Sequence, residues 1–491
     1  MGFLRKNRAI PSIKPNDSQN GAVSSAEPIV NPNRYIREHT PKKSPDSERD
    51  VRPEGRRDRD RIVYSVHFHR LSGVTQVTTP VSEGLLTHTR LTHSLKVAQV
   101  ARSLAESILQ EDEKKDIVAE LGGLDPDVVE AAALAHDLGH PPFGHIGEEI
   151  LDAYAREKLG IWDGFEGNAQ SFRIVTKLDQ RSSHHPGMDL TAATRAAICK
   201  YPWKRKLHLT KKESEANPDS KIEEFLQWKK FNAYETEHEE MRSVLENIQG
   251  SYQQSQTLEA AIMDVADDIT YAIHDLDDFI SAGIINVLEI LRELADWLEF
   301  SNKTHFLSRL ASRLKLEYPN LFSPLEYDLA VRATFNSLNG IPFSGQDVRP
   351  PDQAHALRIF TSRTISRFSE NVRINRAGRA GQNGPVEFEP DVWHEIQILK
   401  ELTRVFVIYR ADMAAVQQGQ RRLLWDLLEC VTHWVDTDKK RLPPGLRVVN
   451  DPDRVSRRSI IDFVAGLTDH QAISLHASLQ GETSTIIGNF L

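Results

Sequence analysis

The sequence of 491 residues has little cysteine and no long uninterrupted apolar run, and both absences exclude whole classes of protein. Its two cysteines, Cys199 and Cys430, stand apart and outside any CxxC pair, which argues against a disulfide framework or a thiolate metal site. No apolar stretch follows the basic residues at the N-terminus, so we expect no signal peptide. The most apolar stretch, 279–298, is interrupted by four charged residues, which is unfavourable for a membrane span. These features together predict a cytoplasmic protein without a membrane segment.

Strand-like alternation of apolar and polar residues is also almost absent, and the fold class that we predict is all-α. Helical periodicity is clear in six stretches that are spread along the chain. They are Thr92–Glu111, Asp127–His136, Thr191–Lys200, Thr257–Ile280, Ile284–Phe300 and Arg422–Val435.

The charge is unevenly distributed and suggests three regions. The net charge is −9, yet residues 1–60 contain 13 Lys and Arg against 9 Asp and Glu. Residues 1–57 are polar and rich in Pro and Ser, which predicts a disordered tail. We expect a helical core over 58–285, with a charged insertion at about 204–256, and further helices over 286–491 packed on that core. A Gly- and Asn-rich stretch at 376–390 predicts a mobile surface loop.

The doublet His136-Asp137 is the most informative local feature. It follows an apolar helical stretch rich in alanine, and a buried imidazole and carboxylate are costly unless something compensates them. A divalent metal ion provides that compensation, because it takes nitrogen from His and oxygen from Asp. His140 follows four residues later on the expected helix face, and Pro141-Pro142 then ends that helix.

Two further polar residues follow in a glycine-bracketed turn. His145 lies between Gly144 and Gly147, and Glu148 stands three residues after it, on the same face if a helix restarts there. Three histidines and two carboxylates thus gather within a short segment, which is atypical of a solvated charge run.

Distant residues must complete such a metal site, since two adjacent ligands leave the ion under-coordinated. His93 lies near the start of an amphipathic helix, beside the cap-like Thr92. Asp267, Tyr271 and Asp275 are spaced four apart and form one stripe on a helix. An acidic solvent face is the alternative interpretation of this stripe, and the embedded tyrosine argues against it.

The series His93, His136-Asp137 and Asp267 resembles the four-ligand signature of the HD superfamily of metal-dependent phosphohydrolases. Longer blocks between about residues 56 and 475 resemble, in the same order, the deoxyguanosine triphosphate triphosphohydrolase family. They are RDRDRIVYSVHFHRLSGVTQV, THTRLTHSLKVAQVARSLA, LAHDLGHPPFGHIGEE, FEGNAQSFRI, KYPW, KKFNAYETE, ADDITYAIHDLDD and AGLTDHQA.

That resemblance implies an HD-domain helical core and the hydrolysis of dGTP or other dNTPs to deoxynucleoside and inorganic triphosphate. It implies that His93, His136, Asp137 and Asp267 hold one divalent ion, Mn²⁺ or Mg²⁺, with Fe²⁺ also compatible with these ligands. His145 and Glu148 match the catalytic pair of the family, and His140 matches a residue that contacts the phosphates or supports the pair.

The resemblance also implies a set of substrate contacts. Arg90 would face the triphosphate, and Tyr271 and Asp275 would face the deoxyribose. The structural alternatives are that Tyr271 is a core residue and that Arg90 forms a surface salt bridge. The remaining positions that match the substrate cavity are Gln76, Val77, Glu166, Asn168, Lys200 and Tyr201.

Two other functions remain open at this point. Another HD phosphohydrolase activity, on a nucleoside monophosphate, a cyclic dinucleotide or an alarmone, would use the same four ligands. A nucleotide-responsive regulator that binds single-stranded DNA is the second, suggested by the basic tail and the charged insertion. Members of the family commonly form homo-oligomers, hexamers among them, and a dNTP effector is compatible with the resemblance.

Overall fold

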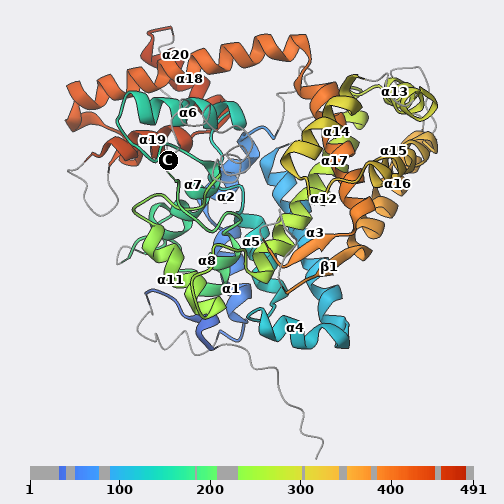
Figure 1. Ribbon diagram of the computed structural model, residues 1–491. Coiled ribbons are helices and arrows are strands. Elements are labelled where there is room, and N and C mark those ends of the chain that lie inside the picture. The colour runs from blue at the N-terminus through green and yellow to red at the C-terminus, as the bar shows by residue number, and fades with distance from the viewer. Residues whose placement is uncertain are drawn as a thin grey trace, which may run out of the picture.

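The computed structural model describes residues 32–39, 50–76, 89–182, 185–206, 230–300, 305–341, 351–376, 384–447 and 455–482. Within these ranges the protein is built from helices and one small two-stranded sheet, which confirms the all-α prediction (Figure 1). None of the helices in the described part of the chain is long and apolar enough to cross a membrane.

The helices fall into three groups along the chain. The first group is α1 (Glu54–Val63), α2 (Val66–Arg70), α3 (Arg90–Gln110), α4 (Lys115–Glu120), α5 (Pro126–Ala135), α6 (His145–Glu157), α7 (Gly167–Arg173), α8 (Ala192–Ala197), α11 (His238–Gln249) and α12 (Leu258–Ser281). The second is α13 (Val287–Phe300), α14 (His305–Glu317), α15 (Pro324–Asn339), α16 (Pro351–Glu370) and α17 (Pro390–Thr403). The third is α18 (Ala411–Thr437), α19 (Arg457–Ala465) and α20 (Asp469–Leu479).

Helices α3, α5 and α12 form the centre of the larger hydrophobic core, with α1 and α8 packed against α5. Each of the three begins at a side chain that accepts a backbone N–H: Thr89 for α3, Asp125 for α5 and Thr257 for α12. The run of small residues at 131–135 is fully buried in α5, and small side chains let neighbouring helices approach closely. Thr89 caps α3, so the cap expected at Thr92 lies three residues too late.

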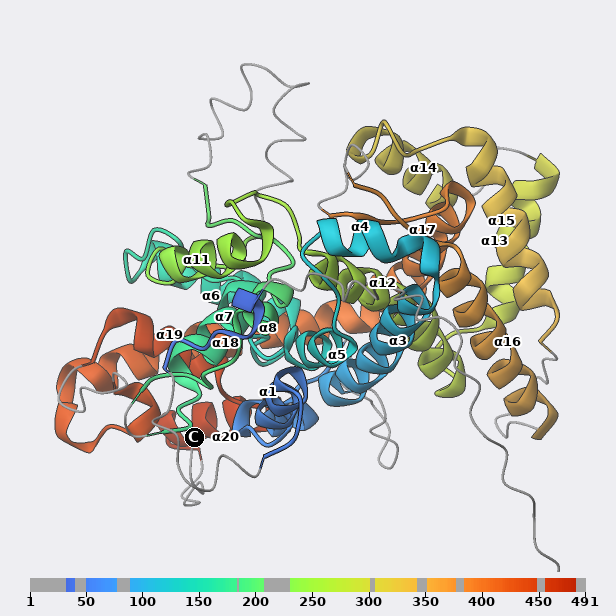
Figure 2. The same cartoon turned by 90° about the horizontal axis from the view of Figure 1, so that it is seen from below.

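The helices after residue 286 pack on two different sides of this centre. Figures 1 and 2 show α13–α17 on one side, next to α12, and α18–α20 on the other, next to α6. The second group joins the larger core, whereas α6 and α18–α20 enclose a separate hydrophobic core. The segment between α5 and α6, which contains the His136-Asp137 doublet, therefore runs from one core to the other.

Part of the predicted N-terminal tail is packed against the helices. Arg34 is buried, pairs with Glu259 of α12 and donates to the carbonyl of Gly122. The structure therefore differs from the prediction of a disordered tail over residues 32–39, and the parts at 1–31 and 40–49 lie outside the described residues.

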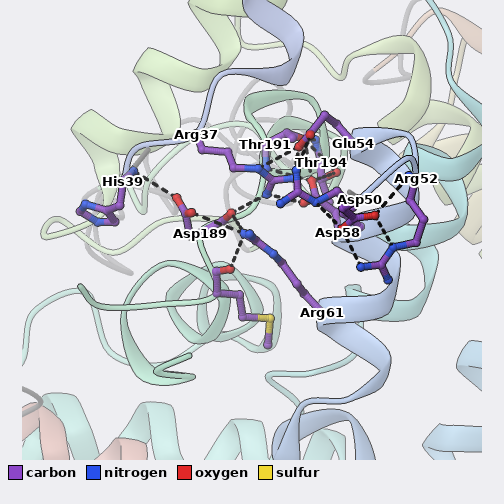
Figure 3. Close-up of polar contacts among 12 residues, drawn as sticks. Arg37, His39, Asp50, Arg52, Glu54, Asp58, Arg61, Asp189, Thr191 and Thr194 are labelled. Atoms are coloured by element: carbon purple, nitrogen blue, oxygen red, sulfur yellow. Dashed lines mark hydrogen bonds and ion pairs between the residues drawn. The ribbon is translucent and has the colours of Figure 1, made fainter. Parts of the chain in front are cut away.

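Arg37 makes the second anchor of this segment, as Figure 3 shows. Its Nη1 lies 2.6 Å from Asp58 Oδ1 and 2.6 Å from the carbonyl oxygen of Asp189. The other oxygen of Asp58 accepts from Thr191 N at 2.9 Å and from Thr194 Oγ1 at 2.7 Å. One fully buried carboxylate thus joins α1 to the start of α8, and the arginine neutralises its charge.

Two other segments also differ from the expectations. Residues 207–229 of the charged insertion lie outside the described part, but α11 within it buries one apolar face and packs against α8. Within the loop predicted at 376–390, residues 386–388 form β2 (Val386–Phe388), which pairs antiparallel with β1 (Val372–Ile374). Residues 377–383 lie outside the described residues.

Candidate active site

The segment from His136 to His140 is a turn and not the end of a helix. Helix α5 ends at Ala135, after which Leu138 N donates to Ala135 O at 3.2 Å and His140 N donates to Asp137 O at 3.1 Å. The expected helical alignment of His136 with His140 is therefore wrong. The turn nevertheless brings His140 Nδ1 to within 3.0 Å of Asp137 Oδ1.

The four predicted metal ligands meet at the point where α3, the turn and α12 converge. His93 Nε2 lies 3.1 Å from Asp267 Oδ1, and His136 Nε2 lies 3.8 Å from the same oxygen. His136 Nε2 is also 3.3 Å from Asp137 Oδ1. Ligand atoms of His93, His136 and Asp137 lie within 4.8 Å of one another, and all three side chains are buried. Two imidazoles and two carboxylates therefore face one small volume.

A comparison of two buried histidines shows what distinguishes His136. In both, Nδ1 lies close to a backbone carbonyl: Ala133 O at 2.7 Å for His136, and Pro390 O at 2.6 Å for His394. His394 Nε2 then accepts the backbone N–H of Ser323 at 3.0 Å. His136 Nε2 is buried with no hydrogen-bond partner and faces two carboxylates. This arrangement leaves the Nε2 of His136 directed at the volume between the two carboxylates, where it can donate its lone pair to a cation.

Each of the two carboxylates predicted to bind metal directs one oxygen toward the cluster, and its other oxygen accepts from a basic side chain. Asp137 Oδ2 accepts from Arg90 Nη1 at 2.8 Å, and Asp267 Oδ2 accepts from Lys200 Nζ at 2.8 Å. Burial alone would raise the pKa of Asp137, but His136, His140 and Arg90 outweigh it and hold that pKa well below its usual range. Both carboxylates are therefore ionised and oriented, and the donor set fits one divalent transition-metal ion.

A second cluster lies beside this set and contains the predicted catalytic pair. His145 Nδ1 lies 2.8 Å from Glu148 Oε2, and Glu148 Oε1 lies 3.5 Å from His140 Nε2. Burial opposes the ionised form of Glu148, but the charges of His140 and His145 lower its pKa below the ordinary value. The His145 side chain is 69% exposed, whereas Glu148 is 16% exposed. An ionised carboxylate thus orients an imidazole that opens to solvent.

Glu166 and Asn168, predicted to line the cavity, form the start of α7. One Glu166 oxygen accepts from the backbone of Asn168 at 2.6 Å and of Ala169 at 3.1 Å, and the other accepts from the Asn168 side chain at 2.8 Å. Glu166 is therefore the cap of α7, a structural role in addition to the one that the resemblance implies.

Glu166 makes the stability of the metal-free protein depend on pH. Burial, followed by the charge of Glu148, raises the pKa of Glu166 from 4.5 to about 7. Since the folded state binds this proton more tightly, the contribution to stability is present below pH 4.5 and is lost as the pH rises to 7. We expect the Tm of Glu166→Gln to rise relative to wild type over that interval, as measured by differential scanning fluorimetry. A difference in Tm that stays constant from pH 4.5 to pH 7.5 would contradict this assignment.

Gly167 leaves the space that the Glu148 carboxylate occupies. A Cβ on Gly167 would overlap Glu148 Oε1 and lie 3.4 Å from His140 Cε1. Because Oε1 is the end of a flexible side chain, Gly167→Ala should displace the carboxylate rather than unfold the protein. We expect kcat to fall by about 10- to 100-fold with little change in Tm.

Gly419→Ala is the matched control for that variant, because a Cβ at this position in α18 meets nothing within 4 Å. We expect it to leave kcat unchanged and to stabilise the helix by up to about 1 kcal/mol. If steady-state kinetics gave the same kcat for the two variants, the space that Gly167 leaves for the Glu148 carboxylate would not be needed for catalysis.

The predicted substrate residues are distributed around these two clusters. Lys200 and Tyr201 stand at the Asp267 side, where Lys200 also pairs with Asp264 at 2.6 Å. The backbone of Gln76 approaches Gly144, at the start of α6, and Val77 lies outside the described residues. Tyr271 is half-buried on α12, and burial raises its pKa.

Two of the substrate candidates lie against residues predicted to bind the metal. Arg90 is 2% exposed, so it is not the surface residue of the alternative interpretation. Its Nη1 donates to Asp137, so the guanidinium is already partly engaged and could give a substrate phosphate only its remaining N–H groups. Asp275 is 1% exposed, and its Oδ1 lies 3.7 Å from His93 Nδ1. A carboxylate behind a ligating imidazole fixes its tautomer and raises its basicity.

One basic residue near the site was not singled out from the sequence, although it lies in a block that resembles the family. Lys230, in the block KKFNAYETE, lies 5.8 Å from the centre of the Tyr201 ring. The Tyr201 hydroxyl, followed by Glu148 and Glu166, raises the pKa of Lys230 in spite of its burial. From the sequence, a lysine in a charged insertion is expected to be solvent-exposed. Only the folded structure shows that Lys230 lies near Tyr201, Glu148 and Glu166.

Comparison with known proteins agrees with this geometry. The HD domain family model matches residues 90–272, and the phosphohydrolase-associated domain model matches residues 386–478. A deoxyguanosinetriphosphate triphosphohydrolase-like protein of Streptomyces coelicolor is 33% identical, covering 87% of this chain and 92% of its own. The chain belongs to the deoxyguanosinetriphosphate triphosphohydrolase-like family. A relative from Corynebacterium glutamicum (strain R) is 36% identical over 86% of this chain and 89% of its own, and one from Haemophilus influenzae (strain PittEE) is 28% identical over 93% and 98%.

Membership in the deoxyguanosinetriphosphate triphosphohydrolase-like family makes this chain an HD hydrolase. The HD match contains all four predicted ligands as well as His145 and Glu148. HD domains are metal-dependent, and the histidine and aspartate cluster on α3 and the turn provides donors for such an ion.

Proposed function

We propose that this protein is a metal-dependent dNTP triphosphohydrolase that hydrolyses dGTP or other dNTPs to deoxynucleoside and inorganic triphosphate. The observation that carries the proposal is the His145–Glu148 pair beside, but separate from, the four-ligand cluster. A site that only binds a metal ion would not need the additional, solvent-facing imidazole of His145. The names of the relatives point to the same reaction.

In this proposal His93, His136, Asp137 and Asp267 hold one divalent ion, Mn²⁺ or Mg²⁺, with Fe²⁺ as a further option. When bound, the ion supplies positive charge that polarises the α-phosphate. Because Arg90 and Lys200 hold the outer oxygens of the two carboxylates, they keep the inner oxygens directed at the ion.

The His145–Glu148 pair moves the proton. Glu148 occupies His145 Nδ1, so Nε2 is the atom that faces the reactants. That nitrogen either takes a proton from the attacking water or gives one to the leaving 5′ oxygen, and Glu148 stabilises the charged imidazole in both cases. The bond between the α-phosphorus and the 5′ oxygen breaks, and the attacking water becomes an oxygen of the triphosphate.

The remaining side chains bind the substrate. Lys200 and Lys230 add positive charge close to the site, and His140 stands between Asp137 and Glu148, where it can contact phosphate. Gln76, Val77 and Tyr271 are proposed to pack against the sugar, so that a 2′-hydroxyl finds no room. In this scheme Asp275 accepts a hydrogen bond from the 3′-hydroxyl and also stays close to His93.

The proposal is tested by HPLC of each dNTP with purified protein, in Mn²⁺ and in Mg²⁺, and of all four mixed. We expect deoxynucleoside as the nucleoside product, and a faster reaction in the mixture if a dNTP effector is required. Release of deoxynucleoside monophosphate or diphosphate would instead indicate one of the other HD phosphohydrolase activities. Retention of single-stranded DNA without turnover of any dNTP would favour the regulatory function, and light scattering would give the size of the expected homo-oligomer.

A further inference from the structure

The turn between α5 and α6 depends on side chains from distant parts of the chain. Arg70 of α2 is buried, and its Nη2 donates to the carbonyl oxygens of Leu138 at 2.7 Å and His140 at 2.8 Å. Its Nη1 donates to Ala465 O at 3.1 Å and Leu467 O at 3.0 Å, at the junction of α19 and α20. One guanidinium therefore joins the metal-ligand part of the turn to the C-terminal helices.

Asp469, the first residue of α20, makes a second connection to the same turn. Its Oδ1 accepts the backbone N–H of Phe143 at 2.9 Å. Its Oδ2 accepts from the backbone of Thr75 at 3.1 Å and from the Thr75 hydroxyl at 2.6 Å. The carboxylate is 9% exposed and thus ties the turn to the segment that carries Gln76.

Phe143 adopts an uncommon backbone conformation. Its φ is +62°, in the left-handed region that is costly for a side chain of this size. It is followed by Gly144, at φ +57°, and by His145, the first residue of α6. These two successive residues with positive φ set the direction in which α6 leaves the turn, and with it the orientation of His145 and Glu148.

From this geometry we propose that Asp469 is a positioning residue for the His145–Glu148 pair. Its carboxylate holds Phe143 in the left-handed conformation, so the α19–α20 junction is a functional part of the active site. The inference rests on the proposed catalytic role of His145 and Glu148. A purely structural role is the competing explanation, because an acidic residue in the first turn of α20 also stabilises that helix.

Asp469→Asn in the full-length protein tests the proposal, because an amide has only one acceptor oxygen and cannot accept the backbone N–H groups of both Phe143 and Thr75. The control is Asp163→Asn. Asp163 is also buried, accepts a backbone N–H from Glu235 at 2.9 Å and pairs with Arg458 of α19, but it lies away from the turn. Both variants should lose Tm to a similar extent.

We expect kcat of Asp469→Asn to fall by about 10- to 100-fold, with KM for dNTP and the Kd for Mn²⁺ within about threefold of wild type. Hydrogen–deuterium exchange should speed up in peptides that cover residues 141–149. Neither change is expected in the control. If Asp469→Asn does not fold, Asp469→Glu carries the same expectation, because it keeps both oxygens but moves them by one methylene.

The proposal is overturned if kcat of the variant equals that of the control, or if exchange across 141–149 is unchanged. A wild-type protein that hydrolyses no dNTP would refute the proposed function alone. In that case exchange across 141–149 still decides whether Asp469 positions the start of α6.

Discussion

We expect His136→Ala to abolish both metal binding and hydrolysis. The buried Nε2 of His136 has no hydrogen-bond partner and faces Asp137 and Asp267. Loss of the ion removes several kcal/mol of charge stabilisation at the phosphate, which corresponds to a fall in kcat of about 10³-fold or more. The metal content of the purified protein, from inductively coupled plasma mass spectrometry, should fall from about one ion per chain to almost none.

His394→Ala is the matched control for this variant. His394 is fully buried and makes the same contact from Nδ1 to a backbone carbonyl, but its Nε2 already accepts the N–H of Ser323. We expect this variant to lose stability, by roughly 1–3 kcal/mol for the donors and acceptors left without partners, and to keep its metal. Full metal content in His136→Ala would contradict the assignment of the site.

The second large effect is expected from Glu148→Gln. The amide cannot carry the negative charge that stabilises a protonated His145, although it keeps the size of the side chain and one acceptor oxygen. We expect kcat to fall by about 10²- to 10⁴-fold, the range associated with loss of general acid–base catalysis. Metal content and the Tm should stay close to those of wild type, since Glu148 is not one of the four ligands.

His145→Ala should give a similar loss, and the double variant should be little worse than the poorer single variant, because the two residues act as a unit. Because the His145 side chain is exposed, we expect His145→Ala to remain folded, and circular dichroism checks this. If the two losses multiplied in the double variant, or if Glu148→Gln released the metal, the separation of the pair from the metal site would be wrong.

Much of the central fold follows from local sequence. The periodicity of apolar residues predicts α3, α5 and α12 to within about two residues, because polar caps and a proline mark where two of them begin. The packing of residues 32–39 against the helices does not follow, since Arg34 and Arg37 have the appearance of a basic tail in the sequence. Their partners Glu259 and Asp58 are separate in sequence, so only the packed chain shows the ion pairs.

The site was predictable where a helix sets the spacing and not where distant side chains set it. The stripe from Asp267 to Asp275 follows helical geometry, but the approach of Asp275 to His93 depends on how α12 packs against α3. The turn that follows Ala135 could not be predicted, because side chains distant in sequence, Arg70 and Ser171, satisfy its backbone groups. Judged from Pro141 alone, the helix would be expected to end only near His140.

The most direct test of the central claim is the fate of oxygen during hydrolysis of dGTP in ¹⁸O-labelled water with Mn²⁺. The products are followed by ³¹P NMR and mass spectrometry. Our account predicts intact inorganic triphosphate that carries one ¹⁸O on a terminal phosphorus, together with unlabelled deoxyguanosine. Formation of phosphate or pyrophosphate, or the label in deoxyguanosine, would contradict it.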